Sequence, residues 1–246
     1  MKCNFVLTNS GRATTAQGQL SAIFPRIKTT QSLAKTVAPP REAAMALVEE
    51  LRRARIQRQD HKYFVPLSDL TRLITSSVIE TEILDGGLTS PANIQACAGR
   101  TEKSAKKIFA ILTFQKKVSA ICSLLDHQLS DEALPFIQKR DSSSGLFSLW
   151  WREPEQRIQA FNDWGDDEVE EFGRLQWWVI PPVFNKDSLD CLELRDETIL
   201  PFIDIKDHEK MDEGIPHMKI GGYSEVTAFR VHPAHHNFWD ASIPLV

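Results

Sequence analysis

Paired cysteines and long apolar runs are scarce in this chain of 246 residues. The four cysteines, Cys3, Cys97, Cys122 and Cys191, form no C-x-x-C pair, which argues against a zinc ribbon or a thioredoxin-type site. Scattered single thiols are typical of a reducing compartment. The apolar run Ile108–Leu112 has five residues, whereas a membrane-spanning helix needs about 20. The sequence therefore predicts no membrane association.

Positive charge is also scarce where most of the acidic residues lie. Residues 1–41 hold six basic and no acidic residues, residues 141–246 hold 9 basic and 21 acidic residues, and the net charge is −4. Because nucleic-acid binding depends on Lys and Arg neutralising phosphates, this balance predicts no nucleic-acid partner. The chain is expected to be intracellular, in the cytoplasm or nucleus. Its basic, Ser- and Thr-rich start predicts a disordered tail, with mitochondrial targeting as the less favoured interpretation.

Helix signals dominate the part of the chain that follows this tail. Apolar residues recur there at helical spacing, with few Gly or Pro residues between the signals. Ser68 is a plausible N-cap for a helix ending near Leu84, and proline in Ser90-Pro91 suits the first position of another helix. The longest continuous helix is predicted over residues 101–128. The predicted helices begin at Arg41, Ser68, Ser90 and Thr101.

Aromatic residues and then a glycine pair mark the second half of the chain. The aromatic-rich stretch is expected to pack onto the helices, because large aromatic side chains bury much area. Apolar and polar residues partly alternate around Gly221-Gly222, which predicts a β-hairpin. The fold class is therefore mainly α with a short C-terminal β-hairpin. The expected divisions are a disordered or targeting-like tail, a helical region, an aromatic and acidic connecting segment, and the hairpin region, over residues 1–40, 41–140, 141–213 and 214–246.

Six short motifs occur in a fixed order along the chain. They are KIFAIL from Lys107, SDEALPF from Ser130, QWWVIPPVF from Gln176, ILPF from Ile199, IGGYSEV from Ile220 and RVHPAHHNF from Arg230. As a series they resemble a large group of fungal protein-kinase-like proteins, in which a helical region precedes a kinase domain. In that group a glycine-rich loop, G-x-G-x-[FY]-[GS]-x-V, is followed by an IHP-x-HHNF stretch.

This resemblance implies a serine/threonine protein kinase of a signalling system, with ATP and magnesium as cofactors. It further implies that the hairpin corresponds to the first two strands of a kinase N-lobe. Gly221 matches the second glycine of the loop, Tyr223 the aromatic at its tip and Val226 the valine that contacts adenine. The chain departs from the pattern at Lys219, which occupies the first glycine position, and at the third, which is Ser224. The implied nucleotide-binding residues are Gly221, Gly222, Tyr223, Ser224 and Val226.

Most kinase machinery is missing from the sequence. No lysine follows Lys219, and neither H-R-D nor D-F-G occurs anywhere, although phosphoryl transfer depends on the corresponding Lys and Asp side chains. We therefore expect a kinase-like chain cut short by an early stop or a misplaced gene boundary. It would be non-catalytic, with no catalytic residue assigned and no ATP bound. The alternative is a non-enzymatic helical regulatory or interaction module that binds a protein partner through its helical region.

Two further groups of polar residues allow more than one interpretation. His232, His235 and His236 form an H-x-x-H-H cluster that could ligate zinc, but Pro233 disfavours a helix there, and a structural role near a strand end is favoured. The carboxylates between Asp187 and Glu197 could provide an acid–base pair. Nothing fixes two of them at a working separation, so a charged surface is favoured.

Overall fold

The structure, a computed structural model, describes residues 40–58, 60–87, 90–187, 194–203, 218–220, 225–227 and 230–238. The chain divides into two units, Met1–Val37 and Ala38–Val246. All the described residues belong to the second unit, so the predicted tail lies outside the described residues except for Pro40.

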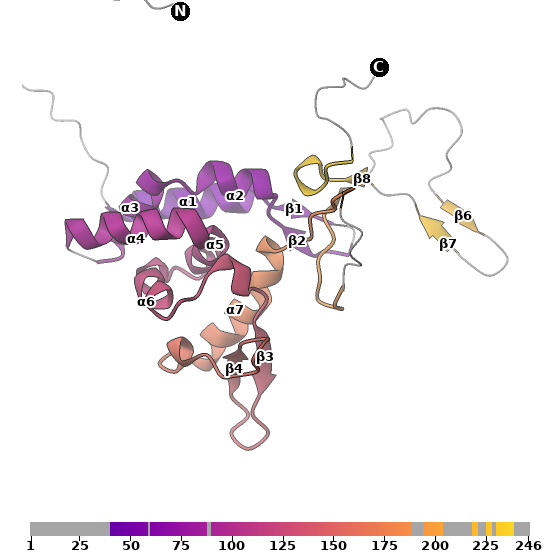
Figure 1. The fold of residues 1–246 in the computed structure, drawn as a ribbon. Helices are drawn as coiled ribbons and strands as arrows, with labels where there is room; N and C mark the ends of the chain where they lie inside the picture. Colours follow the sequence, from indigo (N-terminus) through magenta and orange to yellow (C-terminus); the bar gives the residue numbers. More distant parts are fainter. Residues whose placement is uncertain are drawn as a thin grey trace, which may run out of the picture. The chain divides into compact units, whose positions relative to one another are not determined.

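Helices make up about half of the described chain and the strands are few and short, which confirms the mainly α fold class (Figure 1). The α-helices are α1 (Pro40–Ala54), α2 (Leu67–Leu73), α3 (Ser76–Asp85), α4 (Pro91–Ser104), α5 (Lys106–Phe114), α6 (Ile121–Asp126) and α7 (Asp166–Val179). The short 3-10 helices are η1 (Val118–Ala120), η2 (Asp131–Ala133), η3 (Gln159–Phe161) and η4 (Pro233–His235).

The strands are short and pair antiparallel, two by two. They are β1 (Ile56–Gln57) with β2 (Tyr63–Phe64), β3 (Ile137–Arg140) with β4 (Phe147–Trp150), β5 (Phe202–Ile203) with β8 (Arg230–Val231), and β6 (Met218–Ile220) with β7 (Glu225–Thr227).

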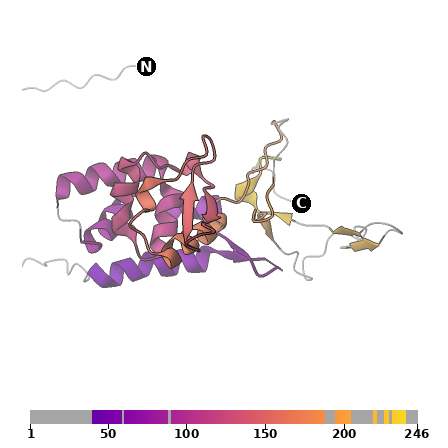
Figure 2. The ribbon, with the colours of Figure 1, turned by 90° about the horizontal axis from the view of Figure 1, so that it is seen from below.

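Helix α5 is the centre of the hydrophobic core. Every residue from Ile108 to Phe114 is buried, and α5 contacts α1, α2, α4, α6 and α7. Figure 1 shows α5 among these helices, and Figure 2 shows the same group of helices turned by 90°. A helix that is apolar all round is stable only when it is surrounded in this way.

The N-terminus of α5 is capped from a distant part of the chain. The carboxylate of Asp131 accepts hydrogen bonds from the backbone amides of Lys107 and Ile108, each at 3.0 Å. Burial raises the pKa of Asp131, while these amide hydrogen bonds oppose the rise. Asp131 thus satisfies two of the amides that a helix start leaves without intrahelical partners.

The continuous helix predicted over residues 101–128 is wrong. The chain leaves the helical conformation after α4, and again after α5 at Lys116, whose φ is 58°. The amide of Lys117 donates to the carbonyl of Leu112 at 2.8 Å, the bond that closes a Schellman C-cap.

Helix α6 ends in the same way. Gln128 has a φ of 62°, and the amide of Leu129 donates to the carbonyl of Leu124 at 3.1 Å. Glycine is the usual residue at such left-handed positions. Because Lys116 and Gln128 stand there instead, the two helix ends carry no glycine that a reader of the sequence could recognise.

The helix predicted from Ser68 to Leu84 is also divided. Its first part is α2, with Pro66 rather than Ser68 at the N-cap and no side-chain cap hydrogen bond. The second part, α3, starts after Thr75, which is extended. The predicted start at Ser90 is confirmed, with proline in the first turn of α4.

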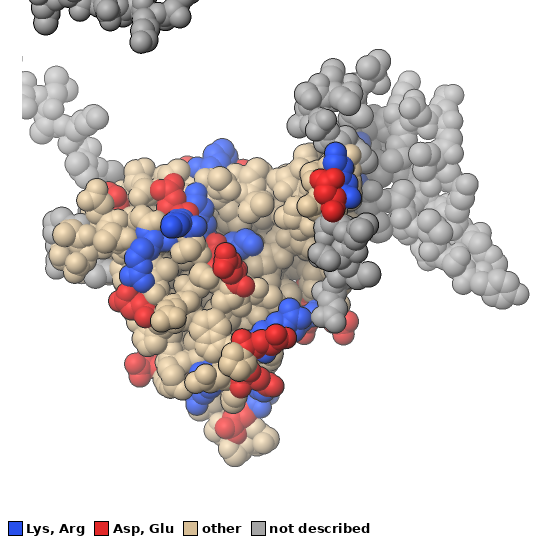
Figure 3. Space-filling view, in the orientation of Figure 1, with Lys and Arg blue, Asp and Glu red and all other residues tan. Residues whose placement is uncertain are grey.

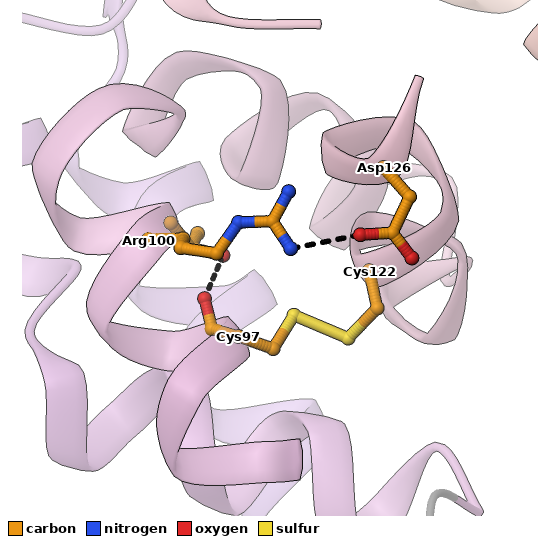
Figure 4. Close-up of a disulfide and its surroundings, with 5 residues drawn as sticks. Cys97, Arg100, Cys122 and Asp126 are labelled. Atoms are coloured by element: carbon orange, nitrogen blue, oxygen red, sulfur yellow. Dashed lines mark hydrogen bonds and ion pairs between the residues drawn. A yellow bond between two sulfur atoms is a disulfide. The ribbon is translucent and has the colours of Figure 1, made fainter. Parts of the chain in front are cut away.

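A disulfide joins α4 to α6. Cys97 and Cys122 are bonded, with 5.8 Å between their Cα atoms, so the expectation of four separate thiols is wrong for this pair. Beside it, Nη1 of Arg100 lies 2.8 Å from Oδ1 of Asp126, and Figure 4 shows both links bridging the same two helices. The two cysteines are 25 residues apart in the sequence, so their pairing could not be predicted before the packing of α4 against α6 was known.

The aromatic-rich stretch packs onto the helical region, as predicted. The ring centroid of Phe172 on α7 lies 5.0 Å from that of Phe161 and 5.9 Å from that of Phe136. The side chain of Gln176 accepts from the amide of Phe136 at 2.8 Å and donates to its carbonyl at 3.1 Å. Helix α7 contacts α5 directly, so this stretch contributes to the same core.

Surface charge is mixed on the face that Figure 3 shows. Basic and acidic side chains lie interspersed there, without one large area of a single sign. Among the described residues, no helix combines the length and apolar content needed to cross a bilayer.

Candidate functional site

The predicted nucleotide-binding hairpin is described only in its strands. Strands β6 and β7 pair antiparallel, with Lys219 opposite Val226 and Ile220 opposite Glu225. Gly221, Gly222, Tyr223 and Ser224 lie outside the described residues. Val226 lies in β7, on the return strand where the sequence predicts it.

The chain that follows this hairpin is attached to the helical body. We call residues 230–238 the docked segment. It begins with β8, which pairs antiparallel with β5 through Phe202 opposite Val231. The amide of His232 then donates to the carbonyl of Pro201 at 2.9 Å. Two motifs that lie about 30 residues apart in the sequence are therefore joined by backbone hydrogen bonds.

His235 is the anchor of the docked segment. It is 1% exposed, and its Nε2 accepts a hydrogen bond from the backbone amide of Leu67 at 3.1 Å. Its Nδ1 lies 3.2 Å from the carbonyl oxygen of Pro182. Because a carbonyl can only accept, Nδ1 carries the proton and the ring is the neutral tautomer. Leu67 is the first residue of α2, so this imidazole caps a helix that lacks a side-chain cap of its own.

Aromatic rings surround the anchor. The ring of Phe64 on β2 meets His235 edge to face at 5.9 Å and His232 at 6.1 Å between centroids. Burial lowers the pKa of His235 to about 4 and also lowers the pKa of His232. Desolvation penalises the imidazolium form, so the site holds His235 neutral at ordinary pH.

The end of the docked segment is held by a second set of hydrogen bonds. Phe184 and His236 form a parallel β-bridge. The amide of Lys186 donates to Oδ1 of Asn237 at 2.7 Å, and Nδ2 of Asn237 donates to Oδ1 of Asn185 at 2.6 Å. Asn237 thus fixes the end of the docked segment, because both the oxygen and the nitrogen of its side-chain amide are hydrogen-bonded.

The motifs that carried the resemblance contact one another in pairs. Phe136 of the second motif is bonded to Gln176 of the third, Pro182 of the third to His235 of the last, and Phe202 of the fourth pairs with Val231 of the last. Motifs that lie far apart along the chain are therefore in contact in the folded structure. The sequence predicted a structural role for the histidines. It did not indicate Leu67 as a partner, because nothing in the sequence marks its backbone amide as a hydrogen-bond donor to His235.

The histidine cluster does not assemble a metal site among the described residues. No group of three or more His, Cys, Asp or Glu side chains lies there in positions to hold a metal ion. Both ring nitrogens of His235 are engaged by backbone groups. The structural interpretation of His235 thus has positive evidence in its favour.

An open groove lies away from the docked segment, where α6 ends. It has a volume of about 810 Å³ and is lined by His127, Glu132, Trp151, Arg152 and Glu153, among others. It combines an aromatic side chain with charges of both signs. Such a surface suits a polar peptide better than a nucleotide, whose phosphates would meet two carboxylates.

Comparison with family models, curated proteins and solved structures finds no match to this chain. The kinase-like resemblance therefore rests on the motif residues themselves.

Proposed function

We propose that this chain is a non-catalytic protein-kinase-like protein whose helical body holds the segment following a glycine-rich loop. The observation that carries the proposal is the docking of the RVHPAHHNF stretch, through His235, onto the start of α2 and the carbonyl of Pro182. The proposal is also supported by the antiparallel pair β6–β7, which precedes this stretch in the sequence.

The proposed lack of catalysis in these 246 residues rests on the chemistry of phosphoryl transfer. That reaction depends on electrostatic stabilisation by a phosphate-binding Lys, metal-binding Asp and Asn side chains and a catalytic Asp. The sequence has no lysine after Lys219 and neither H-R-D nor D-F-G. A hairpin alone offers backbone donors, which do not replace these groups.

A phosphotransfer assay tests the catalytic part. The full chain is incubated with magnesium, labelled ATP and casein as acceptor, beside a Gly221→Pro variant. We expect no turnover from either protein. Magnesium-dependent turnover by the wild type that disappears in Gly221→Pro would overturn the non-catalytic assignment.

Hydrogen–deuterium exchange tests the scaffold part. We expect the amides of residues 183–186 and 231–237 to be protected together, and Asn237→Ala to increase exchange in both by a few-fold, as the loss of about 1 kcal/mol predicts. Asn162→Ala, which removes an exposed side-chain amide hydrogen-bonded to Gln159, is the matched control. Unprotected exchange of residues 231–237 in the wild type would refute docking.

The interaction-module alternative is supported by the groove at the end of α6. In this reading a protein partner places a polar peptide segment against Trp151. A photocrosslinking residue in place of Gln156, which lines the groove, should capture a partner that the same residue at the nearby exposed position Gln159 does not. Trp151→Ala should abolish that capture, and equal capture from both positions would count against this alternative.

A further inference from the structure

The hydrogen bonds of His235 in the docked segment depend on the protonation state of its ring. Among residues 230–238, His235 is the only one fully buried. Its two nitrogens meet backbone groups of opposite character: an amide donor at Leu67 and a carbonyl acceptor at Pro182. A neutral imidazole satisfies both at once.

A protonated ring cannot make the same contacts. The imidazolium carries a hydrogen on each nitrogen and accepts nothing. Its Nε2–H would then point at the amide hydrogen of Leu67, 3.1 Å away from nitrogen to nitrogen. The donor would lose its partner at a part-buried position, and the ring that faces it is itself buried, so the loss costs free energy.

Charged neighbours from every packed element bear on this ring. From α5, Lys107 opposes a positive charge on His235, and so does His232 of the same segment. From α2, Asp69 favours charge on His232, whereas His236 opposes it. The prolines at 181 and 182 offer carbonyl oxygens that favour the charged form of His235, and β2 presents the uncharged ring of Phe64. No carboxylate acts on His235 in the described surroundings to compensate for its burial.

We infer that His235 is a pH-sensitive latch: the neutral ring holds the docked segment on α2, and protonation releases it. The latch rests on the proposed function in one respect, since the released segment is the one that follows the glycine-rich loop. Strand β7 ends at Thr227 and β8 begins at Arg230, so the released segment begins shortly after the return strand of the hairpin.

Hydrogen–deuterium exchange of the full chain at about pH 7.5 and about pH 5, corrected for the intrinsic exchange rate, measures the release. In the wild type we expect exchange in residues 230–238 and at the amide of Leu67 to rise on the order of tenfold at the lower pH. The peptides of α5 should not change, because their amides lie in the buried centre of the body.

The variant His235→Gln separates the latch from general acid sensitivity. Glutamine offers one donor and one acceptor but does not titrate in this range. We expect its exchange to be alike at both pH values. His127→Gln, which replaces an exposed histidine at the C-cap of α6, should retain the wild-type response. A response of the same size in wild type and His235→Gln would refute the assignment to His235.

A second variant protects the test against misfolding of the first. Leu67→Pro removes the donated hydrogen at the first position of a helix, where proline is tolerated. Pro66 before it already has φ −58° and ψ 143°, the conformation that a following proline requires. We expect faster exchange of residues 230–238 at about pH 7.5 and a smaller pH response, with circular dichroism unchanged. Exchange identical to the wild type at both pH values would overturn the latch.

An NMR titration of the wild type tests the latch without any variant. In an NMR titration of the ring carbons, His235 should titrate well below the ordinary histidine range, whereas a midpoint near 6.5 would contradict the latch. These outcomes do not depend on the phosphotransfer assay, so failure of the kinase-like proposal and failure of the latch can be told apart.

Discussion

The helical body around α5 and the docked segment are held by different kinds of interaction. Helix α5 is enclosed by apolar side chains and carries no charge in its buried part. The docked segment is held by hydrogen bonds to backbone groups through His235 and Asn237. Apolar packing is insensitive to pH, whereas a histidine contact is not. The comparison indicates a stable body carrying a conditionally attached segment.

The largest expected effect on the free energy of unfolding comes from removing a phenylalanine ring, which should cost more in the helical body than in the docked segment. Phe109 on α5 is fully buried, so Phe109→Ala should lower the free energy of unfolding by about 3–5 kcal/mol. Phe238→Ala deletes the same atoms in the docked segment at a position 37% exposed, and should lower it by about 1 kcal/mol or less. Urea denaturation measures both, and equal losses would contradict the comparison.

Reduction of the disulfide should weaken the body by a slightly smaller amount. The Cys97–Cys122 bond closes a loop over a separation of 25 residues, for which chain entropy gives roughly 3 kcal/mol of stabilisation. Unfolding is compared with and without reductant. The double variant Cys97→Ala, Cys122→Ala is the control and should not respond to reductant. If the wild type does not respond either, the bond does not form in solution.

Glu82 gives the body a pH dependence of its own, opposite in sign to that of His235. Glu82 is 3% exposed, and burial, aided by Asp85, raises its pKa to about 7. Between about pH 4.5 and 7 the folded state holds a proton that the unfolded state releases, so stability falls as pH rises through this range. Glu82→Gln should gain roughly 2–3 kcal/mol over the wild type at about pH 8 and little at about pH 4.5.

Glu80→Gln is the matched control for that prediction, on the same helix and with no burial of comparable degree. It should change the free energy of unfolding by less than about 0.5 kcal/mol at either pH. A gain for Glu82→Gln that is independent of pH would show that the carboxyl is ionised throughout. His235 acts in the opposite sense, because its lowered pKa makes stability fall as pH drops below about 6.5 toward 4.

The smallest expected effect concerns the end of α6, which has a left-handed residue other than glycine. Gln128 has a left-handed backbone conformation, which strains any residue with a Cβ atom. Gln128→Gly should therefore stabilise the protein by about 0.5–1 kcal/mol. Gln128→Ala retains the strain and should not stabilise. Thermal unfolding distinguishes the two, and a loss in Gln128→Gly would show that the side chain contributes contacts of its own.

The features that could be predicted from the sequence were those with a local signal. The helix start at Ser90-Pro91 and the antiparallel pair around Gly221-Gly222 were predicted, because each depends on residues within a few positions of one another. The breaks after α4 and α5 were missed, the second because Lys116 takes a conformation that usually signals glycine. The N-cap of α2 was misplaced for a related reason: its acceptor comes from His235, 168 residues away.

The candidate site was predicted in part. The sequence indicated that the histidines near the end of the chain play a structural role, and the structure identifies that role for His235. The glycine-rich loop itself, from Gly221 to Ser224, lies outside the described residues, so its nucleotide-binding role stays a prediction. The cysteine pairing was not predicted, because a separation of 25 residues has no meaning until two helices pack side by side.

The sequence by itself determined the mainly α character and the position of the hairpin strands. These follow from periodicity, turn chemistry and residue identity, which do not need long-range contacts. Only the tertiary structure decided where the long helices break, which cysteines pair and what His235 does. Each of these depends on groups that come together when apolar burial brings distant parts of the chain into contact, and a linear pattern does not contain that proximity.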